Sequence, residues 1–144
     1  LKSLDDKDAL VDMYIRGIDF CLEHDYPSND FIRENFKGVM EKHGVFLDDA
    51  IALQDQSKCI ALGTTNGKVT ATGYSVSEVW AKHDSALNIV AKDNAFVMVD
   101  VYDNAVVNVI ASDRAKVCVN HHGGKVIQKA TGDAVVKIRE KSNK

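Results

Sequence analysis

The chain has 144 residues and a mass of 15.8 kDa, which fits one domain or one domain with a cap. Its content of 45% hydrophobic and 27% charged residues excludes wholesale disorder. The net charge of −3, with acids and bases interspersed, gives no basic footprint for nucleic acid. No apolar run approaches the roughly 18 residues that a membrane span requires. Neither a nucleic acid partner nor a membrane span is therefore expected.

The cysteines, Cys21, Cys59 and Cys118, lie in three separate segments. Their odd number argues against a disulfide framework, and none lies in a CxxC or CxxH motif of the kind that binds zinc. We expect all three to act as small hydrophobic residues. The chain begins at Leu1 rather than at a methionine, which indicates that it starts inside a longer sequence. The absence of a signal peptide therefore says nothing of the compartment, although a cytoplasmic location is slightly favoured.

Residues 1–44 are predicted to form a helical cap segment. In the first expected helix, which Ser3 would cap and Pro27 would end, the apolar residues Val11, Tyr14, Ile15, Ile18 and Leu22 recur at helical spacing. In the second, which starts near Ser28 and ends at Gly44, the apolar stripe consists of Ile32, Phe36, Val39 and Met40. Each helix is expected to run for about 15 to 18 residues. Because each has one apolar stripe, both must pack against another part of the protein.

Residues 45–67 change to short apolar runs, at 45–47, 51–53 and 59–62, which are typical of short strands leading into another structure. Asn66-Gly67 then predicts a tight turn, because both residues tolerate positive φ. This segment is interpreted as a transition.

From Lys68 to about Arg139 the sequence repeats every ten residues. The clearest units begin at Ala95, Ala105 and Ala115, and each has valines at alternate positions before a turn such as Asp103-Asn104. The repeat holds without insertion to Gly124 and slips by one residue before Ala134. Such internal periodicity is the most specific signal in the chain.

Alternation within each unit separates an apolar face from a mixed face. Two residues of the apolar face, Ser77 and His121, are polar. The residues of this face are Ser77, Val79, Ala81, Leu87, Ile89, Ala91, Val97, Val99, Val101, Val107, Val109, Ala111, Val117, Val119 and His121. Nearly all of these residues are Ala or Val, and small side chains suit a narrow interior between two close sheets. We therefore predict a mainly β fold in which two N-terminal helices cap a β-solenoid formed by residues 68–144. The alternative is an α+β fold, in which the helices cover an antiparallel meander.

A solenoid has open ends that must be protected from end-to-end polymerisation. The helical segment is the expected cap at one end. At the other end the charged tail is expected to have the same effect through Lys137, Arg139, Glu140, Lys141 and Lys144.

The units resemble the decapeptide strings "D/G-N-A-x-V-x-V/A-x-x" in hypothetical proteins of gut Bacteroidetes, related bacteria and their phages. The matching residues are Asp93-Asn94-Ala95, Asp103-Asn104-Ala105 and Asp113-Arg114-Ala115, with the valines after each. A helical segment such as 20–38 also looks like the leader of some of these proteins. The resemblance implies the architecture and brings no particular chemistry with it.

Three kinds of chemical site were considered and none is expected. The turn aspartates Asp93, Asp103, Asp113 and Asp133 lack the glycine-rich spacing of calcium-binding β-rolls, so we expect them to accept local backbone hydrogen bonds and adopt positive φ. His121 and His122 are neighbours on a strand and face opposite ways, which argues against a joint metal site. Asp100 is the only acid in the middle of the mixed face, so no acid–base pair is visible. We therefore predict neither enzymatic activity nor a cofactor.

The mixed face is more apolar than a solvated surface requires. Its interaction candidates are Trp80, Val90, Met98, Tyr102 and Ile110. The chain's own helices, a second copy or a foreign ligand are the possible covers. We predict a non-enzymatic structural or interaction module that self-associates through this face, with a protein or a glycan as other possible partners. The alternative function is a carbohydrate-binding or carbohydrate-active β-helix, with Trp80 and Tyr102 as stacking platforms.

Overall fold

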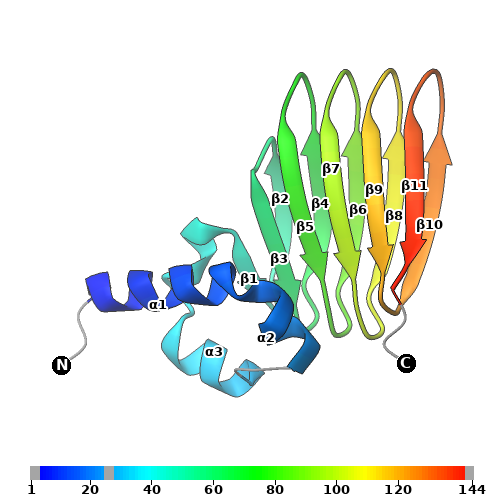
Figure 1. Ribbon diagram of the computed structural model, residues 1–144. Coiled ribbons are helices and arrows are strands. Elements are labelled where there is room, and N and C mark those ends of the chain that lie inside the picture. The colour runs from blue at the N-terminus through cyan, green and yellow to red at the C-terminus, as the bar shows by residue number, and fades with distance from the viewer. Residues whose placement is uncertain (1–3, 25–27, 142–144) are drawn as a thin grey trace.

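A computed structural model describes residues 4–24 and 28–141 (Figure 1). Its helices are α1 (Leu4–Arg16), α2 (Ile18–His24), α3 (Asn29–Asn35) and the short 3₁₀ helix η1 (Met40–His43). The strands are β1 (Val45–Leu47), β2 (Ala50–Gln54), β3 (Lys58–Leu62), β4 (Asn66–Ala71), β5 (Val76–Ala81), β6 (Ala86–Ala91), β7 (Phe96–Val101), β8 (Val106–Ala111), β9 (Lys116–His121), β10 (Lys125–Ala130) and β11 (Val135–Glu140).

The strands alternate between two parallel sheets, as expected for a β-solenoid. Sheet A has the order β1-β3-β5-β7-β9-β11, and sheet B has the order β10-β8-β6-β4-β2. Every strand pair in these sheets is parallel. The solenoid prediction is therefore confirmed, and the antiparallel meander is excluded.

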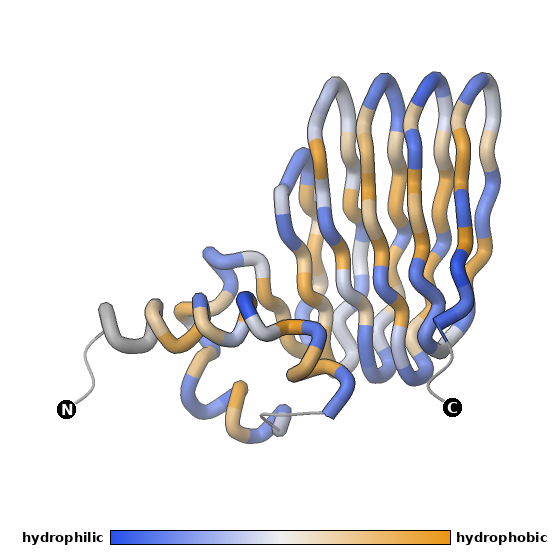
Figure 2. Tube along the Cα trace, viewed as in Figure 1, coloured by the Kyte–Doolittle hydropathy of each residue, from blue (hydrophilic) through white to orange (hydrophobic). Residues whose placement is uncertain are grey.

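The ten-residue unit is half a coil, so residues twenty apart pair in the same sheet. Val79 pairs with Val99, which pairs with Val119, and Ile89 pairs with Val109 in the other sheet. Between the sheets lies a continuous core of small and β-branched side chains that contains most of the predicted inward residues. Figure 2 shows the corresponding alternation of hydrophobic and hydrophilic positions along the strands. The predicted inner face is confirmed, and its exception, His121, is partly exposed.

The turn aspartates adopt the left-handed conformation and bond across coils. Asp93, Asp103 and Asp113 have φ values of 59°, 56° and 59°. The Oδ2 atom of Asp93 accepts a hydrogen bond from Gly73 N at 3.0 Å, and that of Asp113 accepts one from Asp93 N at 3.2 Å. Asp103 lies on the opposite edge of the solenoid, where it forms a 2.8 Å ion pair with buried Lys82. Positive φ was predicted correctly, but the carboxylates bond to neighbouring coils rather than locally.

The register slip occurs at the turn between β9 and β10. This turn contains three residues, 122–124, whereas the preceding turns of the repeat contain four. The last coil therefore pairs at a spacing of nineteen, with Ile138 opposite Val119. Asp133 shifts with it: its N–H donates to the Asp113 carbonyl, and Gly132 takes the left-handed position instead. Asp133 thus does not belong to the aspartate column.

The expected transition strands are themselves members of the two sheets, and parallel pairing starts at Val45. The predicted turn at Asn66-Gly67 is wrong, because both residues lie in β4 and the preceding turn is at 63–65. Gly67 has φ of +146°, and a Cβ there would lie 1.9 Å from the Ile51 carbonyl oxygen. Glycine is present because two coils approach closely, not because the chain reverses.

The helices are shorter than predicted. The first is divided at Gly17 into α1 and α2, although the bond from Gly17 N to the Met13 carbonyl keeps the two nearly continuous. The second ends at Asn35, and a left-handed Gly38 separates it from η1. Gly44 ends η1 in the left-handed conformation, as predicted, and Ser28 caps α3 by accepting from Phe31 N. The predicted roles of Ser3, Pro27 and Lys144 lie outside the described residues.

The helices cover the outer side of sheet A at its first coils (Figure 1). Their apolar residues form a second core with the outward side chains of β1, β3 and β5. This core consists of Val11, Tyr14, Ile18, Leu22, Ile32, Phe36, Met40, Val45, Leu47, Ile60, Leu62, Trp80 and Tyr102. Among the described residues it contains none from sheet B. The helical segment therefore covers the outer side of sheet A in addition to capping the first coil.

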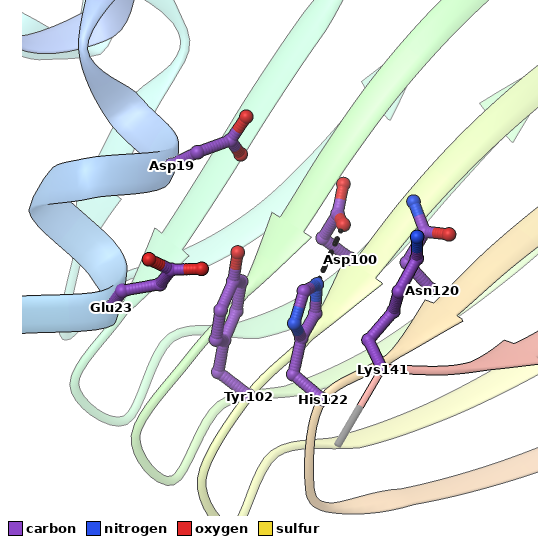
Figure 3. Close-up of a pocket in the computed structure, with 7 residues that line it drawn as sticks. All are labelled: Asp19, Glu23, Asp100, Tyr102, Asn120, His122 and Lys141. Atoms are coloured by element: carbon purple, nitrogen blue, oxygen red, sulfur yellow. Dashed lines mark hydrogen bonds and ion pairs between the residues drawn. The ribbon is translucent and has the colours of Figure 1, made fainter. Parts of the chain in front are cut away.

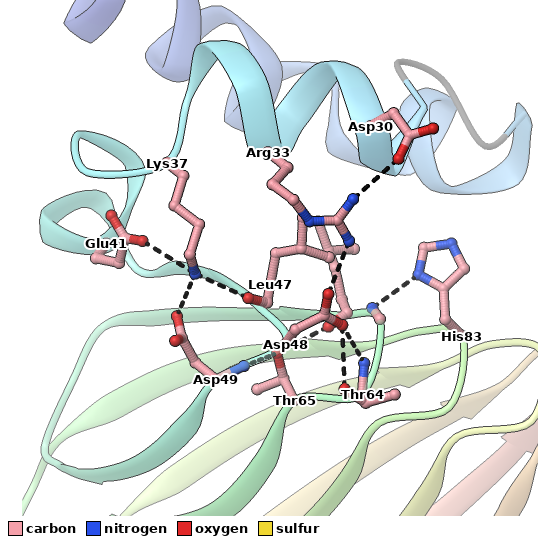
Figure 4. A network of polar contacts seen from close by, with 12 residues as sticks. Asp30, Arg33, Lys37, Glu41, Leu47, Asp48, Asp49, Thr64, Thr65 and His83 are labelled. Atoms are coloured by element: carbon pink, nitrogen blue, oxygen red, sulfur yellow. Dashed lines mark hydrogen bonds and ion pairs between the residues drawn. The ribbon is translucent and has the colours of Figure 1, made fainter.

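Ion pairs hold α3 and the residues just after it to the first turn of the solenoid (Figure 4). Arg33 contacts Asp48 at 2.8 Å, and Lys37 contacts Asp49 at 3.1 Å. The Asp48 carboxylate also accepts from the Thr64 backbone N–H at 2.8 Å in the next coil. That N–H, followed by the Arg33 guanidinium, holds the pKa of Asp48 below its usual range. One carboxylate thus joins the helices to two coils.

The close approach at Gly67 predicts a large effect of a single methyl group. Gly67→Ala is expected to lower the free energy of unfolding by about 3 kcal/mol or more, because strain at φ of +146° adds to a backbone clash. Gly73→Ala is the matched control: Gly73 is also left-handed, with φ of +61°, but open space surrounds its Cβ position. It should lose only about 1 to 2 kcal/mol. Urea denaturation measures both, and equal losses would contradict the clash.

His121 ties the last coil to the rest of the solenoid. Its Nδ1 lies 2.7 Å from Glu140 Oε1 on β11, and its Nε2 lies 2.9 Å from the Gly124 carbonyl oxygen. Both ring nitrogens donate only when the imidazole is protonated. The hydrogen bond to Gly124, followed by that to Glu140, accordingly raises the pKa of His121.

This contact predicts that the last coil loosens as pH rises. A raised folded-state pKa stabilises the fold below the unfolded value of about 6.5, and that stabilisation is lost as pH passes the folded value. The effect should stay below about 1 kcal/mol, because the Glu140 side chain is 73% exposed. Hydrogen exchange of β11 amides, corrected for intrinsic rates, should show protection falling as pH rises above about 6.5. His121→Asn should remove this dependence; an unchanged profile would contradict the assignment.

Candidate functional site

The five interaction candidates do not lie on one surface. Trp80 and Tyr102 are on the sheet A side and are 6% and 4% exposed, because the helices cover them. The indole Nε1 of Trp80 donates to Asp19 Oδ1 on α2 at 3.4 Å. Neither ring face is therefore open to a glycan in this conformation.

The other three candidates are separated by the thickness of the solenoid. Met98 lies on the outer side of sheet A and is 37% exposed, whereas Val90 and Ile110 pair with each other on the outer side of sheet B. Consecutive ten-residue units belong to opposite sheets, so residues that share one face of the repeat in the sequence are divided between two faces in space.

Sheet B has an outer side that the second core does not reach. Its outward positions are Ala50, Ala52, Gln54, Asn66, Lys68, Thr70, Ala86, Asn88, Val90, Val106, Asn108, Ile110, Lys125, Ile127 and Lys129. We call these residues the B face. Its exposed large apolar side chains, Val106, Ile110 and Ile127, all lie on β8 and β10. The asparagines Asn88 and Asn108 pair in the row between Val106 and Ile110, and Ile127 continues that row on β10. The B face has no carboxylate, imidazole or thiol at these positions.

A pocket of about 340 Å³ opens where α2 faces β7 and β9 (Figure 3). Its lining residues are Asp19, Glu23, Asp100, Tyr102, Asn120, His122 and Lys141. Helix α2 supplies two of the carboxylates and β7 supplies the third. The rest come from β9, from the turns and from the residue after β11. The pocket therefore joins segments that are more than a hundred residues apart in the chain.

Two stacked rings form one side of this pocket. The rings of Tyr102 and His122 lie 4.2 Å apart with an angle of 6° between their planes. His122 Nε2 is 3.0 Å from Asp100 Oδ1, while its Nδ1 is buried and has no hydrogen-bond partner among the described residues. The bond to Asp100 and the ring stacking together fix the imidazole.

The Tyr102 hydroxyl points between the carboxylates of Glu23 and Asp100 (Figure 3). In the described part of the chain no hydrogen bond is formed by this hydroxyl. Burial, and then the negative charges of Asp100, Asp19 and Glu23, raise the pKa of Tyr102 well above its ordinary value. The hydroxyl therefore stays neutral, as both a donor and an acceptor.

Sequence reasoning considered Asp100, Tyr102 and His122 separately and did not bring them together. Tyr102 and His122 are twenty residues apart, the spacing of one full coil, so the period contained the signal once the coil length was known. Asp19, Glu23 and Lys141 had no such signal, because their positions depend on how α2 and the chain after β11 pack.

In residues 4–24 and 28–141, no group of three or more His, Cys, Asp or Glu side chains is placed to hold a metal ion. His121 and His122 face opposite ways, as predicted, and each contacts a different carboxylate. Cys59 lies in the solenoid core, where burial raises the pKa of its thiol to about 12. None of the described helices is long and apolar enough to cross a membrane.

The comparisons with known proteins return no family model, no curated protein and no solved structure that matches this chain. The resemblance to decapeptide-repeat proteins therefore stays a prediction, and function must be argued from the geometry.

The burial of Trp80 predicts a structural role for it. Trp80→Ala is expected to lower the free energy of unfolding by about 3 to 5 kcal/mol, because it leaves a cavity between α2 and sheet A. Val76→Ala on the same strand is the control, since Val76 is 60% exposed and should change stability by less than about 1 kcal/mol. Chemical denaturation followed by circular dichroism measures both variants. Equal small losses would show that the helices do not depend on this contact.

Proposed function

We propose that this protein is a non-enzymatic interaction module that self-associates through the B face. The observation that carries the proposal is the group of exposed apolar side chains on that face: Ile110 is 49% exposed, Ile127 45% and Val106 36%. They lie on adjacent strands beside half-buried Val90. Large apolar side chains gathered on an uncovered sheet are typical of an interface. The lack of acid–base groups at the outward positions of the B face supports a binding role rather than a catalytic one.

A second copy is the partner that fits this face best. The outward side chains form straight rows across the strands, at the regular spacing of a parallel sheet of about 4.8 Å. A surface with the same row spacing can interdigitate along the whole face, and another copy of this sheet has that spacing. On β6 and β8 the apolar pairs Ala86–Val106 and Val90–Ile110 flank the asparagine pair and give two such copies both packing and hydrogen bonds.

The size of the B face predicts weak association. Five strands of about six residues give roughly 20 Å by 24 Å, or about 500 Å² for each partner. The total of about 1,000 Å² lies at the lower limit for a specific interface. We therefore expect a dimer in concentration-dependent exchange with the monomer, not a permanent assembly.

Charge restricts how two copies can meet. The charged residues of the B face are Lys68, Lys125 and Lys129, all positive. A two-fold axis that runs along β6 places β10 of one copy opposite β2 of the other. The outward residues of β2 are neutral. This arrangement separates the lysine-rich strands. Residual repulsion between them should weaken as salt is added, so the dimer should strengthen at higher ionic strength.

Sedimentation equilibrium from about 10 μM to 1 mM, the range suited to a weak interface, tests the proposal. Wild type should dimerise, and Ile110→Glu should raise the dissociation constant at least about tenfold by burying an unpaired charge. Val76→Glu, which adds the same charge to the outer side of sheet A, should leave it unchanged. Thermal unfolding confirms that both variants fold. A wild type that stays monomeric throughout, or a dimer lost equally in both variants, would overturn the proposal.

A further inference from the structure

The pocket beside α2 has an unbalanced set of polar groups. Three carboxylates from two elements face one hollow, those of Asp19, Glu23 and Asp100. Asp100 contacts His122, and Asp19 accepts a long 3.4 Å bond from Trp80. Glu23 has no hydrogen-bond partner in the described part of the chain. The cation in the lining is Lys141, which lies beside Asn120 and across the pocket from α2 (Figure 3).

A second observation is independent of the carboxylates. The Tyr102 residue is 4% exposed, yet its hydroxyl forms no hydrogen bond with the described residues and faces the pocket. The hydroxyl of a largely buried side chain is usually bonded to protein, water or ligand. The pocket therefore contains the unpaired hydroxyl of a largely buried side chain next to surplus acceptors.

We propose that this pocket binds a small organic cation that carries an ammonium group. An ammonium has three donors and no acceptor, which complements carboxylates that only accept. The hydroxyl of Tyr102 can accept one ammonium N–H and donate its own hydrogen to a neighbouring carboxylate. The raised pKa of Tyr102 favours this arrangement, because the hydroxyl stays neutral among negative charges.

The shape of the site favours an organic ligand over a bare metal ion. The volume of about 340 Å³ is at the lower end of small-molecule pockets, which run from about 300 to 1,000 Å³. Among the described residues the carboxylates are not grouped closely enough to ligate one metal. An alkylammonium has methylene groups that can pack against the edges of the Tyr102 and His122 rings. Lys141 and Asn120, on the other side, leave room for a polar group at the far end of the ligand.

Isothermal titration calorimetry with 1,4-diaminobutane tests this proposal, with 1,4-butanediol as a neutral molecule of the same length. The diamine should bind and the diol should not. Glu23→Gln should weaken binding at least about tenfold, because it removes one charge-assisted hydrogen bond without changing shape. Tyr102→Phe keeps the ring and should weaken binding severalfold. Glu78→Gln, on the outer side of β5 and paired with Lys58, is the matched control and should bind like wild type.

Thermal unfolding of each variant shows whether it folds, and sedimentation in the presence of diamine separates this site from self-association. Absence of diamine binding, equal binding of the diol, or unchanged affinity in Glu23→Gln would overturn the proposal. So would calcium chloride binding in the same pocket with displacement of the diamine, since that would identify a metal site. If the dimer forms equally well with and without the diamine, ligand binding and self-association are separate properties, and each proposal is judged by its own experiment.

Discussion

The parallel pairing of each strand with the strand two units later is the interaction on which the rest of the structure depends. In the regular part of the repeat, residue n lies beside residue n + 20 in the same sheet, and backbone hydrogen bonds join successive coils. This pairing stacks residues such as Val99 on Val119 and Ala91 on Ala111, so small and β-branched side chains fill the narrow interior between the sheets. It also aligns the turns, where left-handed aspartates such as Asp93 reach the backbone of the preceding coil. A change of one residue in coil length moves every later row.

The same pairing explains why the outer surface differs from what a ten-residue pattern indicates. Half a coil separates neighbouring units, so Trp80 and Val90 occupy similar places in the repeat but face away from each other. On sheet A the helices cover the outward side chains near the first coils, and Trp80 becomes part of a second core. Sheet B has no such cover among the described helices, and its apolar side chains remain exposed. The two faces have the same backbone geometry and different surroundings, which is why the proposal of self-association concerns the B face.

The helical cover also creates the pocket. Because α2 crosses the outer side of sheet A next to Tyr102, its carboxylates face strand residues across a gap that neither element fills alone. The stacking of Tyr102 on His122 follows directly from the coil spacing, and the bond from His122 to Asp100 fixes the rings in place. The pocket thus forms where a non-repetitive element packs on the uniform surface that the repeat produces.

The sequence by itself determined the repeated strands, the inward rows and the left-handed turns, because each follows from a local rule repeated many times. It favoured the β-solenoid, but the parallel pairing that excludes the antiparallel meander came from the structure. Alternation decides which side chains point inward, and Asp tolerates positive φ. Short-range signals also placed the Ser28 cap and the end of η1 at Gly44. Where a local signal was ambiguous, as at Asn66-Gly67, the prediction failed, because only the neighbouring coil reveals that glycine serves a close approach.

Tertiary structure alone decided which outer side chains are buried and where a pocket forms. Trp80 and Ile110 look equivalent in the sequence, yet one lies under α2 and the other faces outward. The reason is physical: burial of an outward side chain depends on long-range packing between elements that share no period. Asp19 and Glu23 line one pocket with residues more than seventy positions later, and no local pattern encodes that arrangement.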